Sequence, residues 1–242
     1  MTAPNVSNPT RSAATANQVR LPRTAALGPG RGEQPRLLID APAGAAEIYL
    51  HGATVTSWVP RGGAEVIFTS RQAVFDGATA IRGGIPLCLP EFGAGINGDA
   101  VPKHGWARIA PWRLRTVTST DDGGVRALLS VSRDHLTALC EIQIGETLRL
   151  GLSLRNDGTE PRTVEAAAHT YLSVHDVTAS LVSGLAGASY SDNLARSPQE
   201  LRQVQDGDVR ITGPVDRIYD SAEPVTVTDP GHERTIHVDK RN

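Results

Sequence analysis

The sequence predicts an all-β fold, a large antiparallel β-sandwich. Many short runs rich in Val, Ile, Leu and Thr are separated by Gly, Pro, Asn and Asp, which is typical of strands joined by turns. No convincing amphipathic helix interrupts these runs, and no fixed-period repeat indicates a propeller. With 242 residues, 39% of them hydrophobic, the chain is long enough to bury one large core.

The strand-like pattern begins at Arg36 and continues to the end of the chain. The clearest strand is 148–154, where leucine alternates with polar or small residues, so that the four leucines share one face of a sheet. It ends in the turn signal Asn156-Asp157-Gly158. Further strands are expected over 46–50, 54–59, 64–69, 112–118, 125–131 and 138–144.

Residues 1–34 have a different composition. They are rich in Ala, Thr, Pro and Asn and lack apolar periodicity, which indicates a disordered leader before a domain over 35–242. Four arginines and a single acidic residue give this stretch a faint similarity to a transit peptide, but it lacks the apolar core of a secretion signal. Both interpretations, leader and transit peptide, stay open.

Composition excludes several function classes. The net charge of −2 supplies no basic field for nucleic acid or a membrane surface, and no apolar run is long enough to span a bilayer. Cys88 and Cys140 provide neither a disulfide framework nor zinc-type spacing, so we expect a reduced, cytoplasmic setting. No phosphate-binding loop or dinucleotide fingerprint is present, so we expect no cofactor, and we expect a monomer.

One segment, 81–112, breaks the strand pattern. About thirty residues of irregular chain inside a compact domain are usually functional or disordered, and the aromatic and apolar content here favours order. The cations Arg82, Lys103 and Arg108 surround His104 in this segment, which favours a site for an anion or a polyol. A histidine with a purely structural role is the competing interpretation of His104.

His169 is the second candidate. It follows three alanines on a strand that begins after Pro161, so its ring is expected to be partly buried and held rigidly, as a general acid requires. A core histidine bonded to a carbonyl group is the alternative. His175 shares its strand face, but about 20 Å of regular strand separates the two, too far for one metal ion.

Four motifs together resemble a known family. They are 80–93 (with Arg82, Gly83, Gly84 and Pro86), 103–108 (Lys103-His104-Gly105-Trp106-Ala107-Arg108), 168–174 and 215–219. Their residues and order resemble the glucose-6-phosphate 1-epimerases of the aldose 1-epimerase superfamily. The motifs are spread over 36–242, so the resemblance covers most of the chain.

The resemblance implies a galactose-mutarotase-like supersandwich that interconverts the α and β anomers of a hexose 6-phosphate without a cofactor. It implies a small-molecule sugar phosphate as the partner and His169 as the general acid. The residues implied to contact the sugar or its phosphate are Arg82, Lys103, His104, Arg108 and Asp216.

The sequence departs from the family pattern twice. Glu91 stands where the family usually has an aromatic residue, and an acid there would disturb sugar stacking or repel phosphate. The family's basic glutamate lies on C-terminal strands that would follow Asn242, so we expect a C-terminally truncated sandwich, with Glu165 or Asp216 as the nearest internal substitutes. Alternatives are therefore a sugar-phosphate-binding domain without catalysis, an epimerase of unphosphorylated sugars, and an incompletely folded fragment.

Overall fold

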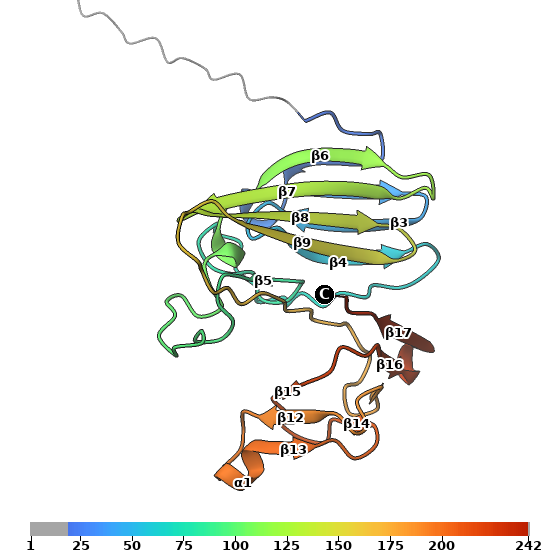
Figure 1. Ribbon diagram of the computed structural model, residues 1–242. Coiled ribbons are helices and arrows are strands. Elements are labelled where there is room, and N and C mark those ends of the chain that lie inside the picture. The colour runs from blue at the N-terminus through green and yellow to red at the C-terminus, as the bar shows by residue number, and fades with distance from the viewer. Residues whose placement is uncertain (1–18, 242) are drawn as a thin grey trace, which may run out of the picture.

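The computed structural model of the protein describes residues 19–241. Two four-stranded antiparallel sheets stack face to face as a sandwich (Figure 1). The first sheet contains β1 (Ala25–Pro29), β2 (Pro35–Ala41), β3 (Gly44–Tyr49) and β4 (Thr54–Pro60), in that order. The second contains β6 (Arg113–Ser119), β7 (Val125–Arg133), β8 (Leu136–Ile144) and β9 (Leu148–Asn156).

The main hydrophobic core lies between these two sheets. Alternate residues of a strand point to the same face, and β8 buries every second side chain from Leu136 to Ile144. These side chains meet Leu37, Ile48 and Val55 of the facing sheet. The alternating leucines of β9 also pack against this core at Leu148, Leu150 and Leu152, whereas Leu154 at the strand end is 36% exposed.

Three smaller sheets lie below the sandwich in the view of Figure 1. One pairs β5 (Leu87–Cys88) with β10 (Ala167–Ala168). A second has the order β14 (Val209–Arg210), β11 (Leu181–Ser183), β16 (Val225–Asp229), β17 (Arg234–Val238). The third has the order β13 (Arg202–Val204), β12 (Ser189–Asp192), β15 (Arg217–Tyr219).

Helical structure is confined to short pieces. The single α-helical turn is α1 (Pro198–Leu201), among residues 19–241. Three 3-10 turns accompany it: η1 (Arg31–Glu33), η2 (Ala107–Ile109) and η3 (Pro230–His232). None of these described helices is long and apolar enough to cross a membrane. The predicted all-β class is therefore confirmed.

Two element predictions are wrong. The sheet begins at β1, which pairs with β2 from Ala25 to Pro29, so the leader boundary at residue 34 was placed too late. β1 is an edge strand with no fully buried residue, which explains its weak apolar signal. Residues 1–18 lie outside the described part of the chain. The predicted strand 64–69 forms isolated bridges from Ile67 to Leu172 and from Thr69 to Gly83.

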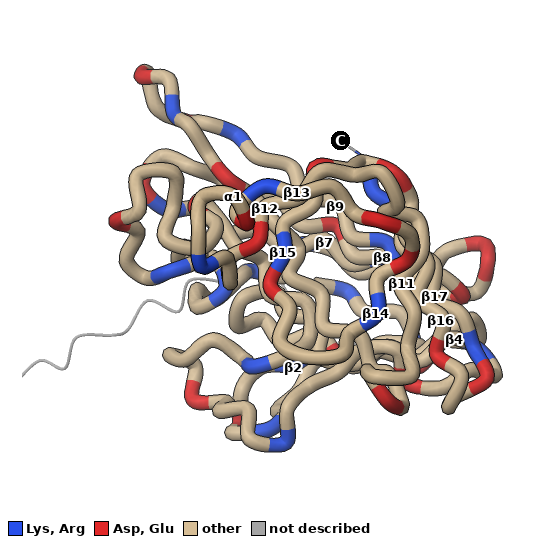
Figure 2. Tube along the Cα trace, turned by 90° about the horizontal axis from the view of Figure 1, so that it is seen from below, with Lys and Arg blue, Asp and Glu red and all other residues tan. Residues whose placement is uncertain are grey.

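The other six predicted strands are confirmed as β3, β4, β6, β7, β8 and β9. Cys88 and Cys140 are both buried and unpaired. Lysine, arginine and acidic residues are interspersed along the trace in Figure 2, in keeping with the near-neutral net charge of −2.

Candidate active site

The predicted catalytic residue His169 lies on an extended segment, 165–173, that follows β9. This segment runs antiparallel to 84–90. The backbone N–H of His169 donates to the Pro86 carbonyl at 3.0 Å, and that of Tyr171 donates to the Gly84 carbonyl at 2.9 Å. β10 and β5 form the regular part of the same ladder. His169 is thus held on a fixed backbone, as the sequence predicted.

A third stretch, 66–69, borders the other side of this segment. The N–H of Phe68 donates to the Tyr171 carbonyl at 2.9 Å, and the N–H of Ser173 donates to the Val66 carbonyl at 2.8 Å. The stretch predicted as a strand over 64–69 therefore serves as one wall of the His169 segment.

Four aromatic rings meet in front of the segment. The His104 and His169 rings lie edge to face with centroids 5.9 Å apart, and the Tyr171 ring stacks on His169 at 4.9 Å. Phe92 contacts both imidazoles, at 5.1 Å from His104 and 6.5 Å from His169. We call Phe92, His104, His169 and Tyr171 the ring cluster. It brings together two histidines that lie far apart in the sequence.

His104 is fixed by two hydrogen bonds to Gly93. Its backbone N–H donates to the Gly93 carbonyl at 2.7 Å, and its Nδ1 accepts the Gly93 N–H at 3.1 Å. Because Nδ1 acts as the acceptor, the neutral ring carries its proton on Nε2. Burial lowers the pKa of His104, and the positive charges of Arg108, His169 and Lys103 lower it further. His104 is therefore neutral near pH 7, and its Nε2–H has no hydrogen-bond acceptor within residues 19–241.

The predicted cations lie at different places around the cluster. Arg108 donates from Nη2 to the Lys103 carbonyl at 2.8 Å, and its Nε is buried without a hydrogen-bond partner in residues 19–241. The Lys103 side chain is exposed beside it. Arg82 is exposed, and its side chain forms no hydrogen bond or ion pair within the described chain. It precedes by two residues Gly84, whose carbonyl group accepts the Tyr171 N–H. Arg82 and Lys103 are thus free to meet a ligand.

Glu165 has a role that the sequence did not reveal. Its backbone N–H donates to the Pro90 carbonyl at 2.8 Å, and its carboxylate accepts the Phe92 N–H at 3.3 Å. The contact links the His169 segment to the loop that carries Phe92. No hydrogen bond or ion pair joins a carboxylate to His104 or His169 within residues 19–241, so Glu165 is not placed as their base.

Asp216 belongs to a different part of the fold. Its carboxylate accepts a hydrogen bond from Asn193 Nδ2 at 3.0 Å, next to the sheet of β12, β13 and β15. No hydrogen bond or ion pair joins Asp216 to the ring cluster among residues 19–241. A sugar-binding role for Asp216 stays a prediction.

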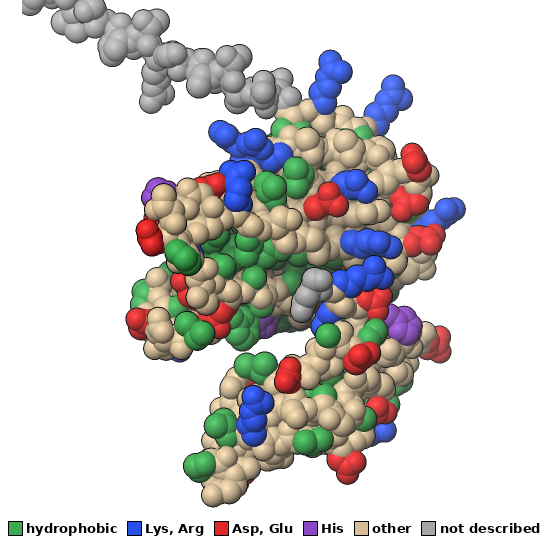
Figure 3. All heavy atoms as spheres, in the orientation of Figure 1, with side chains coloured by type: hydrophobic (Ala, Val, Ile, Leu, Met, Phe, Trp, Pro, Cys, Tyr) green, Lys and Arg blue, Asp and Glu red, His purple; other side chains and the backbone are tan. Residues whose placement is uncertain are grey.

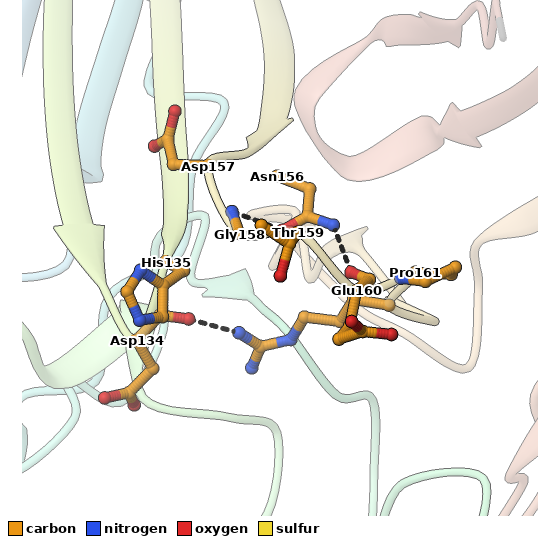
Figure 4. A pocket seen from close by; sticks show the side chains of 9 residues that line it. Asp134, His135, Asn156, Asp157, Gly158, Thr159, Glu160 and Pro161 are labelled. Atoms are coloured by element: carbon orange, nitrogen blue, oxygen red, sulfur yellow. Dashed lines mark hydrogen bonds between the residues drawn. The ribbon is translucent and has the colours of Figure 1, made fainter.

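A separate recess of about 430 Å³ lies where the β7–β8 turn meets the loop after β9 (Figure 4). Its walls are held by hydrogen bonds from Arg162 to the Asp134 carbonyl and from Asn156 to the Glu160 carbonyl, each 2.8 Å long. These contacts stabilise exposed turns, and the recess contains no member of the ring cluster. No group of three or more His, Cys, Asp and Glu residues within 19–241 is arranged to hold a metal ion.

The ring cluster and the ladder around it lie inside a region that matches a known family model, Aldose 1-epimerase, over residues 35–242. The chain belongs to the aldose 1-epimerase family. A family member from Cenchrus ciliaris, named "Putative glucose-6-phosphate 1-epimerase", is 32% identical over 214 residues, which cover 81% of this chain. A protein of the same name from Salmonella typhimurium is 30% identical over 212 residues.

The chain spans 63% of the length of the Cenchrus ciliaris relative and 69% of the Salmonella typhimurium one. Among solved structures, the crystal structure of "a putative mutarotase (YeaD)" from Salmonella typhimurium matches with a TM-score of 0.79 and 27% identity, over 90% of this chain and 74% of that one. A galactose mutarotase-like protein from Clostridium acetobutylicum has a TM-score of 0.60 at 11% identity, over 87% of this chain and 79% of that one. These structural neighbours confirm the predicted galactose-mutarotase-like sandwich.

Proposed function

We propose that this aldose 1-epimerase family member interconverts the α and β anomers of a hexose 6-phosphate. The observation that carries the proposal is the pair of histidines in the ring cluster, His104 and His169, 5.9 Å apart between ring centroids. The relatives named as glucose-6-phosphate 1-epimerases support glucose 6-phosphate as the substrate.

The chemistry needs one acid and one base. A base removes the proton from the C1 hydroxyl group, the acid protonates the ring oxygen, and the C1–O5 bond breaks to give the open-chain aldehyde. Rotation about C1–C2 and the reverse proton transfers close the ring as the other anomer. Each group contributes most when its pKa lies near the working pH, which suits histidine as the acid.

The environment divides the roles of the two histidines. His104 is neutral and presents Nε2–H, so it donates a hydrogen bond to a sugar oxygen. A positive charge on His104 would repel a proton on His169 at this distance. Because His104 is neutral, it does not oppose the protonated form that a general acid needs. We therefore assign proton transfer to His169 and substrate orientation to His104.

The arginines supply recognition of the phosphate. Arg82 is exposed with a free guanidinium group, which can bind phosphate oxygens in a bidentate manner. If the phosphate is recognised, Arg82→Gln weakens binding of glucose 6-phosphate but leaves any binding of glucose unchanged. Equal affinity of the wild-type protein for glucose and glucose 6-phosphate would instead favour an epimerase of unphosphorylated sugars.

The proposal is tested by measuring α/β exchange of glucose 6-phosphate by NMR saturation transfer. We expect His169→Ala to reduce the enzymatic exchange rate by about 10²–10⁴-fold, the usual contribution of a general acid. His135→Asn is the matched control, because His135 lies in the β7–β8 turn with a φ of 59°, which asparagine tolerates. Exchange by the wild-type protein at the rate of buffer alone would refute catalysis.

A second function, sugar-phosphate binding without turnover, is favoured by the absence of a carboxylate contact to either histidine in the described residues. Glu165, the nearest candidate base in the sequence, instead holds the Phe92 N–H. Calorimetric titration with glucose 6-phosphate separates the two functions. Saturable binding together with exchange at the rate of buffer identifies a binding domain.

A further inference from the structure

We propose that Asp229 and Arg234 are positioning residues for His169: together they fix the C-terminal end of the segment that carries it. The inference rests on the proposed function, because it assigns these residues a role in the same acid/base step. Neither side chain belongs to the ring cluster. Both lie on the β16–β17 hairpin, which packs behind the His169 segment.

Arg234 connects three parts of the chain. Its Nη2 donates to the Ser173 carbonyl, four residues beyond His169, and its Nη1 donates to the Glu65 carbonyl at 2.8 Å. Its Nε donates to Asp229 Oδ2 at 3.1 Å. One guanidinium group thus binds the end of the His169 segment and the neighbouring 64–69 stretch at the same time. Its planar fork provides these donors in fixed directions, which a lysine ammonium group cannot reproduce.

Asp229 is the second member of the pair, and we call Asp229 and Arg234 together the clamp. The side chain of Asp229 is fully buried, and Oδ1 accepts the backbone N–H of His175 at 3.1 Å. Oδ2 is shared by Arg234 and by Nδ1 of His232, at 2.8 Å from the latter. A buried carboxylate is costly unless such donors surround it. The Asp229–Arg234 pair therefore binds Ser173, where the His169 segment ends, and His175, two residues beyond it.

The back of the same segment is apolar. Leu172 and Val174 pack against a small core formed by Val66, Val227 and Ile236. Beside it runs a groove of about 490 Å³, lined in part by Ala168, Thr170 and Leu172. Figure 3 shows the indentation below the sandwich, with hydrophobic side chains gathered along its upper wall. The groove leaves this face only partly packed, so the polar clamp adds a restraint to those of the backbone ladder and of Leu172 and Val174.

The restraint matters because the segment is held at both ends. Glu165 secures the N-terminal end to Pro90 and Phe92, and the clamp secures the C-terminal end. Between them, His169 and Tyr171 stack with centroids 4.9 Å apart. Loss of the clamp leaves the end nearest Tyr171 held by its backbone hydrogen bonds alone, and we expect the looser segment to shift His169 relative to His104. A displacement of about 1 Å can reduce a rate by about 10²-fold.

The test compares Arg234→Gln, Arg234→Lys and Asp229→Asn with a control, Arg36→Gln. Arg36 forms a partly buried ion pair with Glu47 between β2 and β3, away from the His169 segment. For each variant, the thermal midpoint, kcat and KM for glucose 6-phosphate exchange are measured. Cross-relaxation between the His169 and Tyr171 rings is followed by NMR in the same proteins.

We expect Arg234→Gln and Asp229→Asn to lower kcat by about 10-fold to 100-fold with little change in KM, and to weaken the His169–Tyr171 cross-peaks. Arg234→Lys should restore part of both. Arg36→Gln should leave kcat and the cross-peaks unchanged even where it lowers the thermal midpoint.

A folded Arg234→Gln variant with wild-type kcat and cross-peaks would overturn the proposal, as would an equal loss of kcat and cross-peaks in Arg36→Gln. If the wild-type protein does not catalyse exchange, the proposed function fails, and the cross-peaks alone decide the positioning role.

Discussion

The two histidines of the ring cluster lie in different environments within the same site. His104 has a left-handed backbone (φ 64°) and Nδ1 committed to Gly93, whereas His169 is extended and stacked on Tyr171. Both histidines could be picked from the sequence because motifs surrounded them. The contacts of Glu165 could not, because they depend on the pairing of 165 with 90, which no local pattern encodes.

The environment of His104 makes stability depend on pH. Its folded pKa lies below the ordinary value of 6.5, mainly because burial disfavours the charged ring. The unfolded chain therefore takes up the proton first, and stability falls as the pH drops below 6.5. His104→Asn should remove this dependence, because asparagine accepts the Gly93 N–H, tolerates the left-handed backbone and does not titrate.

Urea unfolding of both proteins between pH 5.5 and 8 measures the effect. The stability of the wild-type protein relative to His104→Asn should decrease toward acidic pH. A difference that stays constant over this range would contradict the assignment of a lowered pKa.

At the level of elements, the site depends on a segment that is too irregular to show a strand pattern. Gly83 and Gly84 have φ values of 103° and 74°, and they let 84–90 pass close to two neighbouring backbones. A Cβ on Gly84 would lie 2.5 Å from the Val55 carbonyl oxygen, and one on Gly83 would lie 2.5 Å from that of Phe68. The sequence showed these glycines only as part of a family motif, because the need for close approach comes from segments distant in the chain.

Gly84→Ala should therefore destabilise the protein by more than the cost of holding an alanine backbone in the left-handed region. Gly62→Ala is the matched control, since Gly62 has a φ of 67° but nothing lies within 4 Å of its added Cβ. The control should cost about 1–2 kcal/mol of unfolding free energy, and Gly84→Ala should exceed it because the clashing atom is backbone. Equal losses in urea unfolding would show that the close approach has no energetic consequence.

Over the whole molecule, burial is concentrated in the sandwich. The main core joins both four-stranded sheets; β8 buries side chains along its whole length, and β7 buries them from Val125 to Leu129. The sheet of β12, β13 and β15 contributes one buried hydrophobic residue, Tyr190, among the described residues, while Val204 and Ile218 are 62% and 50% exposed. The C-terminal sheets therefore rest on fewer apolar contacts than the sandwich does.

Hydrogen exchange should reveal this difference. Amides of β7 and β8 are expected to exchange only through global unfolding, and those of β12, β13 and β15 through openings of lower free energy. Mass spectrometry of peptides from the two regions measures the rates. Equal protection in both regions would indicate a single cooperative unit.

The sequence alone determined the all-β class, six strands and the family resemblance, and it predicted the two site histidines, because alternation and short motifs are local properties of the chain. It placed the start of the domain at residue 35, ten residues after the first strand begins at Ala25, because an edge strand buries too little to show a pattern. Only the tertiary structure decided which distant segments meet: it brought His104 to His169, paired the carboxylate of Asp216 with Asn193, and set the Asp229–Arg234 clamp behind the His169 segment. These contacts join residues far apart in the chain, and backbone pairing and burial, rather than local sequence, determine them.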